Sequence, residues 1–130
     1  MAANLATALE IATATDPGMV RSHNEDSIAA DAELGLAVLA DGMGGYNAGE
    51  IASGMATTVI TTELQQLLAK TNPYDVEPQT GKPVAQRLLR DQVLKAHDGQ
   101  PPKQGAIWLT YYPNIMIEWY PKVLTVSTLY

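Results

Sequence analysis

The stretch LGLAVLADGMGG, residues 34–45, decides the fold of this 130-residue chain. Its first seven residues are apolar or glycine, which predicts a strand over residues 34–40 that is covered on both faces. Asp41 ends this apolar run, and three glycines follow it within four residues. Glycine permits backbone conformations and close approaches that other residues do not. The stretch therefore predicts a buried strand that delivers a carboxylate into a tight loop.

Hydrophobic spacing predicts further elements on either side of this stretch. Alternating apolar and polar residues predict a strand over residues 9–15, and a further strand is expected over residues 27–30, just before the central apolar run. Asn47, with Glu50 three residues later, fits a capping box, so a helix is expected to begin there. The apolar residues that fall on one broad face of this helix are Ile51, Met55, Val59, Ile60, Leu64, Leu67 and Leu68.

A second helix is predicted over residues 83–99, because Pro83 suits a first helical turn and Gly99 suits a C-cap. After Gly99 the apolar runs 106–112 and 123–126, separated by prolines, predict two or three short strands.

The composition excludes several classes of protein. Eight Lys and Arg stand against fourteen Asp and Glu, which gives a net charge of −6. This balance argues against a partner that is a nucleic acid or an anionic membrane, since both require a basic surface. The absence of cysteine excludes disulfides and thiolate metal ligands. No apolar run is long enough to cross a bilayer and no signal peptide is evident, so a cytoplasmic location is expected.

Charge and aromatic residues are distributed unevenly along the chain. Residues 1–100 hold thirteen acids and six bases, whereas residues 101–130 hold one acid, two bases and six of the eight aromatic residues. Aromatic residues at this density are typical of strand or core packing, although a tail that cannot reach a sheet would be prone to aggregation. The composition therefore predicts two parts, residues 1–99 and an aromatic-rich tail of residues 100–130.

The residues with the clearest chemical potential lie between positions 16 and 50. Glu25 and Asp26 precede one predicted strand and Asp41 ends the next, so their carboxylates are candidates to converge. Converged carboxylates repel unless a cation neutralises them, and oxygen ligands favour Mg²⁺ or Mn²⁺. The Gly42 carbonyl is a further candidate ligand, and the Arg21 guanidinium matches a phosphate. Together they indicate a metal-assisted phosphoryl site. Taken singly, Glu25 and Asp26 are more often solvated loop acids and Arg21 a surface cation, and Asp41 is as often a turn residue as a ligand.

Three motifs carry a resemblance to a known family. They are DPGMVRSHNED at residues 16–26, LADGMGG at residues 39–45 and AGEIAS at residues 48–53. In this order and spacing they resemble the opening motifs of PP2C-type (PPM) serine/threonine protein phosphatases in their bacterial form. The resemblance covers residues 9–99. It implies an α-β-β-α sandwich, with a dinuclear Mg²⁺ or Mn²⁺ centre between two antiparallel sheets and a phosphoprotein as substrate.

The resemblance also implies a role for each candidate residue. Arg21 matches the phosphate-binding arginine of the family. Asp41 matches the aspartate that bridges the two metals, and Gly42 matches the residue whose carbonyl is a ligand. Glu25 matches an acidic metal ligand, and Asp26 matches an acid that helps to hold metal-bound water.

The chain departs from the family after Gly99. Family members continue with a Gly-Thr-Thr strand, a Gly-Asp-Ser-Arg segment and two later motifs whose aspartates supply further metal ligands, and none of these is present here. We therefore expect an incomplete PP2C-like α+β sandwich, from a chain that is truncated or frame-shifted near Gln100.

Three functions follow from these patterns, and the oligomeric state is left open. The first is hydrolysis of phosphoserine and phosphothreonine by attack of metal-bound water, impaired by the missing ligands. The second is a non-catalytic PP2C-like fragment, or pseudophosphatase, that acts by binding. The third is a nucleotide-binding α/β domain, because a glycine loop between a strand and a helix superficially fits a dinucleotide fingerprint, although Asn47 replaces its third glycine.

Overall fold

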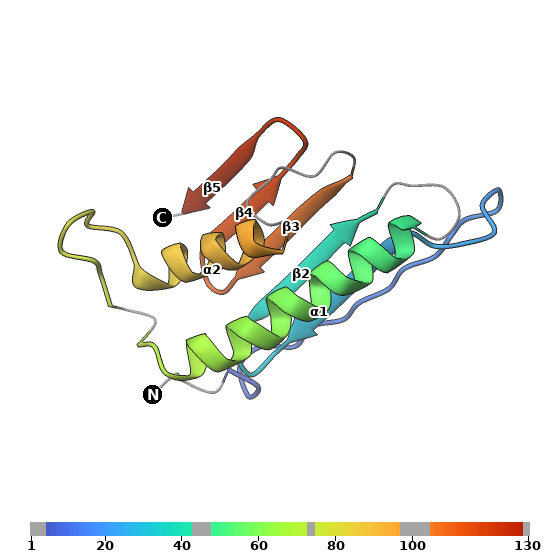
Figure 1. Cartoon of the computed structure of the whole chain (residues 1–130). Helices are drawn as coiled ribbons and strands as arrows, with labels where there is room; N and C mark the ends of the chain where they lie inside the picture. Colours follow the sequence, from blue (N-terminus) through green and yellow to red (C-terminus); the bar gives the residue numbers. More distant parts are fainter. Residues whose placement is uncertain (1–4, 43–47, 73–74, 97–104, 129–130) are drawn as a thin grey trace.

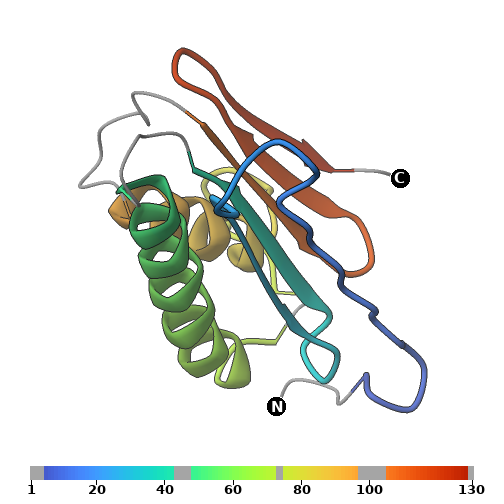
Figure 2. The same cartoon turned by 90° about the vertical axis from the view of Figure 1, so that its right-hand side faces the viewer.

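The described residues form one antiparallel sheet with a layer of two helices on one of its faces (Figures 1 and 2). The computed structural model of the chain describes residues 5–42, 48–72, 75–96 and 105–128. The strands follow one another across the sheet in chain order, from β1 to β5. The elements are β1 (Asp26–Asp31), β2 (Leu36–Asp41), α1 (Ala48–Ala69), α2 (Val84–Lys95), β3 (Ala106–Tyr111), β4 (Ile115–Trp119) and β5 (Leu124–Thr128).

The arrangement confirms the predicted α+β class. All four strand pairings among the described residues are antiparallel. A dinucleotide-binding domain requires parallel strands joined by helical crossovers, and the described sheet contains no such pair. One sheet with one helix layer is compatible with part of the expected two-sheet sandwich.

Strand β2 lies between β1 and β3, and its side chains alternate between two environments. Leu36, Val38 and Ala40 face the helices and are at most 2% exposed. Ala37 and Leu39 face the opposite side and are only half-buried. The prediction of a strand covered on both faces is therefore too strong, because the second face meets an irregular N-terminal segment instead of a helix layer (Figure 2).

Residues 9–15, predicted to be a strand, do not form one. Both edges of β2 are occupied, by β1 and by β3, and the segment runs along the face of the sheet opposite the helices (Figure 2). Leu9 and Ile11 are half-buried, whereas the residues around them are exposed. The alternation in this segment thus reflects the packing of two apolar side chains and not the pairing of a strand.

Helix α1 buries a narrower face than its sequence predicts. Ile60, Leu64 and Leu68 are at most 1% exposed and belong to the main core. Ile51 and Met55, which the sequence assigns to the same face, are 61% and 64% exposed. They belong to a row that is displaced by one residue, or about 100° around the helix, from the buried row. Helical spacing alone therefore overestimated how much of α1 the sheet covers.

Helix α2 begins directly after Pro83, which is its N-cap residue. Proline is favoured near helix starts because its missing N–H would have no helical partner there. Leu89 and Val93 are completely buried against the core. The expected C-cap of this helix, Gly99, and the expected N-cap of α1, Asn47, lie outside the described residues.

Residues 105–128 complete the sheet and are not a detached tail. Strand β3 pairs with β2 along its whole length, and β4 and β5 follow as an antiparallel meander. Ile107, Leu109, Ile117 and Trp119 are at most 3% exposed and lie in the same core as the residues of α1 and α2. The aromatic-rich tail thus contains three strands, the upper number predicted from its sequence.

Within the described ranges, neither helix is long and apolar enough to reach across a bilayer.

The buried side chain of Leu64 in α1 gives a direct test of the fold. Leu64→Ala should lower the free energy of unfolding by about 2–5 kcal/mol, because the deleted side chain is fully buried. Met55→Ala, on the exposed row of the same helix, should change it by no more than about 0.5 kcal/mol. Urea unfolding followed by circular dichroism measures both, and equal effects of the two substitutions would contradict the described packing.

Candidate functional site

The candidate site lies where β1 begins and β2 ends. Asp26, the first residue of β1, is the direct cross-strand partner of Asp41, the last residue of β2. Directly opposed residues of an antiparallel pair have their Cβ atoms about 4.5–5.5 Å apart on the same face. That face is the one opposite the helices, because Leu36, Val38 and Ala40 alternate with Asp41 and point toward α1.

This pair of carboxylates is electrostatically unfavourable. The pKa of Asp41 is raised above its ordinary value, first by burial and then by the hydrogen bond to Asp26 and the charge of Asp26. Glu25 adds a smaller effect in the same direction, and Arg21 opposes it. Like charges directly opposite each other destabilise a sheet. The sheet thus concentrates negative charge at one corner, where a bound cation would relieve the repulsion.

The Glu25 backbone carbonyl holds three elements together at this corner. It accepts a hydrogen bond from the Gly42 N–H at 3.0 Å, which ties the start of β1 to the end of β2. It also accepts one from Ser53 Oγ of α1 at 2.6 Å, and the Ser53 side chain is almost completely buried. On the next residue, the Asp26 N–H donates to Asn24 Oδ1 at 3.0 Å. Hydrogen bonds to their backbone groups therefore fix the positions of Glu25 and Asp26.

The side chain of Glu25 points toward Arg21 and toward the start of α1. Glu25 Oε2 lies 3.8 Å from Arg21 Nη1, and a Cβ built on Gly49 would lie 3.0 Å from Glu25 Oε1. A carboxylate near a helix N-terminus is stabilised by the exposed N–H groups and the helix dipole. The Arg21 side chain is 66% exposed, so its guanidinium is accessible to a ligand.

Glycines allow the backbones to approach closely around the site. A Cβ on Gly42 would lie 2.2 Å from the Gly49 carbonyl oxygen and 2.6 Å from that of Glu25. A Cβ on Gly105, which precedes β3 and has φ of +83°, would lie 2.0 Å from the Asp41 carbonyl oxygen. Only glycine fits at these two positions. The second of them shows that residues beyond 99 pack directly against the candidate site.

The oxygen atoms at the site are the kind of ligand that a hard divalent cation prefers, but the described residues supply too few of them to surround one. Mg²⁺ and Mn²⁺ prefer carboxylate and carbonyl oxygens, which Asp26, Asp41 and Gly42 supply. Within the ranges that the structure describes, however, no three Asp, Glu, His or Cys side chains are placed so that they hold one metal ion together. The Glu25 carboxylate lies 3.8 Å from the Arg21 guanidinium at the same corner. The described residues therefore do not complete a dinuclear centre.

The structure thus gathers all five residues that the sequence singles out, Arg21, Glu25, Asp26, Asp41 and Gly42, at one corner. It adds residues that the sequence reasoning missed. Ser53 lies in the AGEIAS motif, which was its one signal in the sequence, and its contact with the Glu25 carbonyl depends on how α1 packs on β1. Gly105 had no local signal, because its role depends on how β3 pairs with β2.

Comparison with known proteins finds similarity to bacterial serine/threonine phosphatases over part of the chain. The serine/threonine protein phosphatase PstP of Mycobacterium tuberculosis is 45% identical over 58 residues, which are 45% of this chain and 11% of that protein. The serine/threonine phosphatase stp of Listeria innocua is 32% identical over 85 residues, which are 63% of this chain and 33% of that protein.

A second kind of similarity is short. Putrescine 2-hydroxylase of Ralstonia nicotianae is 65% identical over 40 residues, which are 31% of this chain and 11% of that protein. No protein-family model matches the chain. The chain spans a third or less of the length of each of these relatives.

The close approach at Gly42 gives a prediction with a matched control. Gly42→Ala should lower the free energy of unfolding by about 1–3 kcal/mol, because its methyl group would overlap two backbone carbonyls. Gly54→Ala, inside α1 with nothing within 4 Å of the added Cβ, should instead raise it by about 0.5–1 kcal/mol. Urea unfolding of both variants is the measurement. A Gly42→Ala variant as stable as the wild type would contradict the described packing.

Proposed function

We propose that the chain carries the phosphate-binding and first metal-binding residues of a PP2C-type phosphatase that acts on phosphoserine and phosphothreonine in proteins. The observation that supports this most is the convergence of Arg21, Glu25, Asp26, Asp41 and Gly42 at one end of β1 and β2. The similarity to bacterial serine/threonine phosphatases supports the same activity.

The proposed roles follow from position and chemistry. Arg21 binds the phosphoryl oxygens, since its guanidinium is exposed and forms a planar fork. Asp26 and Asp41 face each other and bind the cation, with the Gly42 carbonyl beside them. Glu25 is a further candidate ligand of the cation, and its ion pair holds Arg21 toward this corner. When bound, Mg²⁺ or Mn²⁺ supplies positive charge that stabilises phosphoryl oxygens and activates water.

A second candidate function is binding without turnover. It is favoured by one observation, that the described residues supply fewer than three convergent acidic side chains. A site with so few ligands holds a cation weakly, and the Arg21 side chain can still bind a phosphoryl group. In this alternative the chain is a non-catalytic phosphatase-like protein.

We also propose that the two kinds of similarity divide along the chain. The phosphatase-like part holds the motifs at residues 16–53, and the hydroxylase-like segment of 40 residues lies toward the C-terminus, where it includes the aromatic-rich tail. The matches of 85 and 40 residues fit side by side within 130 residues. The match covers only 11% of the hydroxylase. We therefore propose that the matched segment of this chain contributes strands to the sheet and carries no hydroxylase activity.

Hydrolysis of 4-nitrophenyl phosphate with added Mn²⁺ separates the two candidate functions. The proposal predicts Mn²⁺-dependent turnover that Asp41→Asn reduces by about 100-fold, the size expected when a group that stabilises transition-state charge is removed. Arg21→Ala should lower kcat/KM by about tenfold or more, since hydrogen bonds to charged groups contribute about 1.5–3 kcal/mol.

The matched control for both variants is Glu10→Gln, which removes a charge from an exposed residue outside the site. Its turnover should equal that of the wild type. No turnover by the wild type at high protein concentration, together with phosphate binding that depends on Arg21, would support the non-catalytic function instead. Turnover that is unchanged in the Asp41→Asn variant would contradict both candidate functions, the catalytic one because it requires Asp41 and the non-catalytic one because it excludes turnover.

A further inference from the structure

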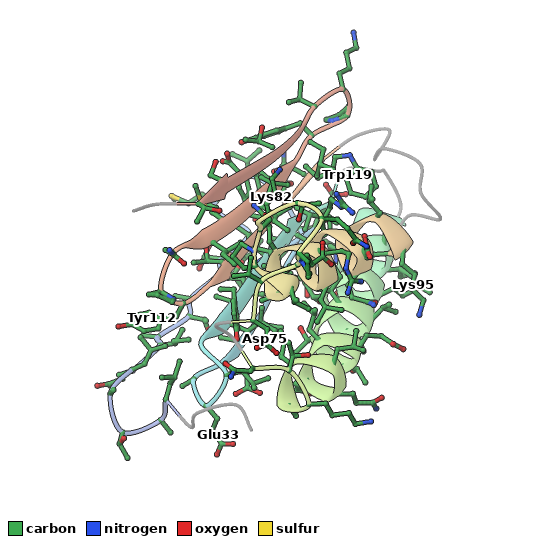
Figure 3. All side chains as sticks on the ribbon, turned by 90° about the vertical axis from the view of Figure 1, so that its left-hand side faces the viewer. Glu33, Asp75, Lys82, Lys95, Tyr112 and Trp119 are labelled. Carbon is green, nitrogen blue, oxygen red and sulfur yellow. The ribbon has the colours of Figure 1, made fainter. Side chains whose placement is uncertain are left out.

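A cavity lies away from the candidate site, between the start of α2, the loop before it and strand β5. Its volume is about 340 Å³, which is within the range of about 300–1,000 Å³ typical of small-ligand sites. Lys82 lines it from the loop, Arg87 and Arg90 line it from α2, and Val126 lines it from β5. Figure 3 views the molecule from the side on which this loop lies and labels Lys82.

The cavity collects positive charge in an acidic protein. Three of the eight Lys and Arg residues line it, although the net charge of the chain is −6. Arg87 and Arg90 are three residues apart, so they project from the same side of α2. Lys82 makes no ion pair with any of the described residues.

Two acidic side chains partly offset this charge. Glu77, which also lines the cavity, forms an ion pair with Arg87 Nε. Asp91 lies 3.6 Å from Arg87 Nη1 and 3.2 Å from Arg90 Nη2. Arg87 is therefore engaged by two carboxylates and Arg90 by one. Lys82 forms no ion pair with the described residues, and the guanidinium of Arg90 keeps donors that Asp91 does not occupy.

The walls of the cavity are held in place by hydrogen bonds. The loop is closed by Glu77 N–H donating to the Lys82 carbonyl at 2.9 Å and by Gly81 N–H donating to the Glu77 carbonyl at 2.8 Å. Gln86 Nε2 of α2 donates to Thr128 Oγ1 of β5 at 3.2 Å. The ion pair between Glu77 and Arg87 joins the loop to α2. The cationic groups are thus presented by a preorganised frame, which lowers the entropic cost of binding.

We propose that this cavity is a second anion site that takes a phosphate group, either as free phosphate or as the phosphoryl group of a phosphorylated peptide. Lys82 and Arg90 are its principal ligands, and Arg87 and Glu77 position the loop that carries Lys82. None of these residues belongs to the candidate site at Arg21, so the proposal does not depend on whether the chain hydrolyses phosphoesters.

The test is a titration of the full ¹⁵N-labelled chain with inorganic phosphate and, separately, with a phosphoserine peptide, followed by NMR amide shifts. Binding at this cavity should shift the amides of residues 77–90. Lys82→Ala and Arg90→Ala should each weaken it by about tenfold, as expected for the loss of one charge-assisted hydrogen bond. In the Arg21→Ala variant, the amide shifts that phosphate causes at residues 77–90 should be the same as in the wild type.

Lys122→Ala is the matched control, because it removes the same charge from an exposed residue outside the cavity. If the phosphoserine peptide binds more tightly than inorganic phosphate, the ligand of the cavity is a phosphorylated peptide. If the two bind equally, the ligand is free phosphate. Either result supports the proposed site. Unchanged affinity in the Lys82→Ala and Arg90→Ala variants, or an equal loss in Lys122→Ala, would overturn it. Retention of the wild-type amide dispersion shows that each variant is folded.

Discussion

The Glu25 carbonyl is the point on which the arrangement of the candidate site depends. Its hydrogen bonds to the Gly42 N–H and to Ser53 Oγ join the beginning of β1, the end of β2 and the first turns of α1. The register that follows places Asp26 opposite Asp41 on the face away from the helices. The raised pKa of Asp41 shows the electrostatic consequence, since burial and the neighbouring Asp26 both disfavour its charge. A stable backbone thus holds an unfavourable pair of charges, which is the situation in which a cation is expected to bind.

Most of the site was predictable because its residues lie close together in the sequence. Arg21, Glu25 and Asp26 precede a strand and Asp41 ends the next, so an antiparallel pairing of the two brings them together. The role of Gly105 was not predictable, because it depends on which strand pairs with β2 and in which register. Residues 9–15 were also mispredicted, because alternation does not show whether a segment pairs with a strand or, as here, lies across the face of the sheet opposite the helices (Figure 2).

The average charge and the average composition both conceal local structure. A chain of net charge −6 contains a negative corner at Asp26 and Asp41 and a cationic cavity at Lys82 and Arg90. The aromatic-rich part, which resembles none of the phosphatase motifs, nevertheless supplies β3, β4 and β5 and a large share of the core. Its differences in composition therefore do not prevent it from packing with the rest of the chain, because the helix-facing positions of its strands are apolar.

The central claim is that the Asp26 and Asp41 pair binds a divalent cation. The most direct measurement is electron paramagnetic resonance of free Mn²⁺ during titration with the full chain, which counts bound ions without requiring turnover. The account predicts that the wild type and Glu10→Gln bind Mn²⁺ with the same affinity, and that the double variant Asp26→Asn, Asp41→Asn binds it at least about tenfold more weakly. Equal affinity in the double variant and the wild type would contradict the account, as would a wild type that binds no Mn²⁺.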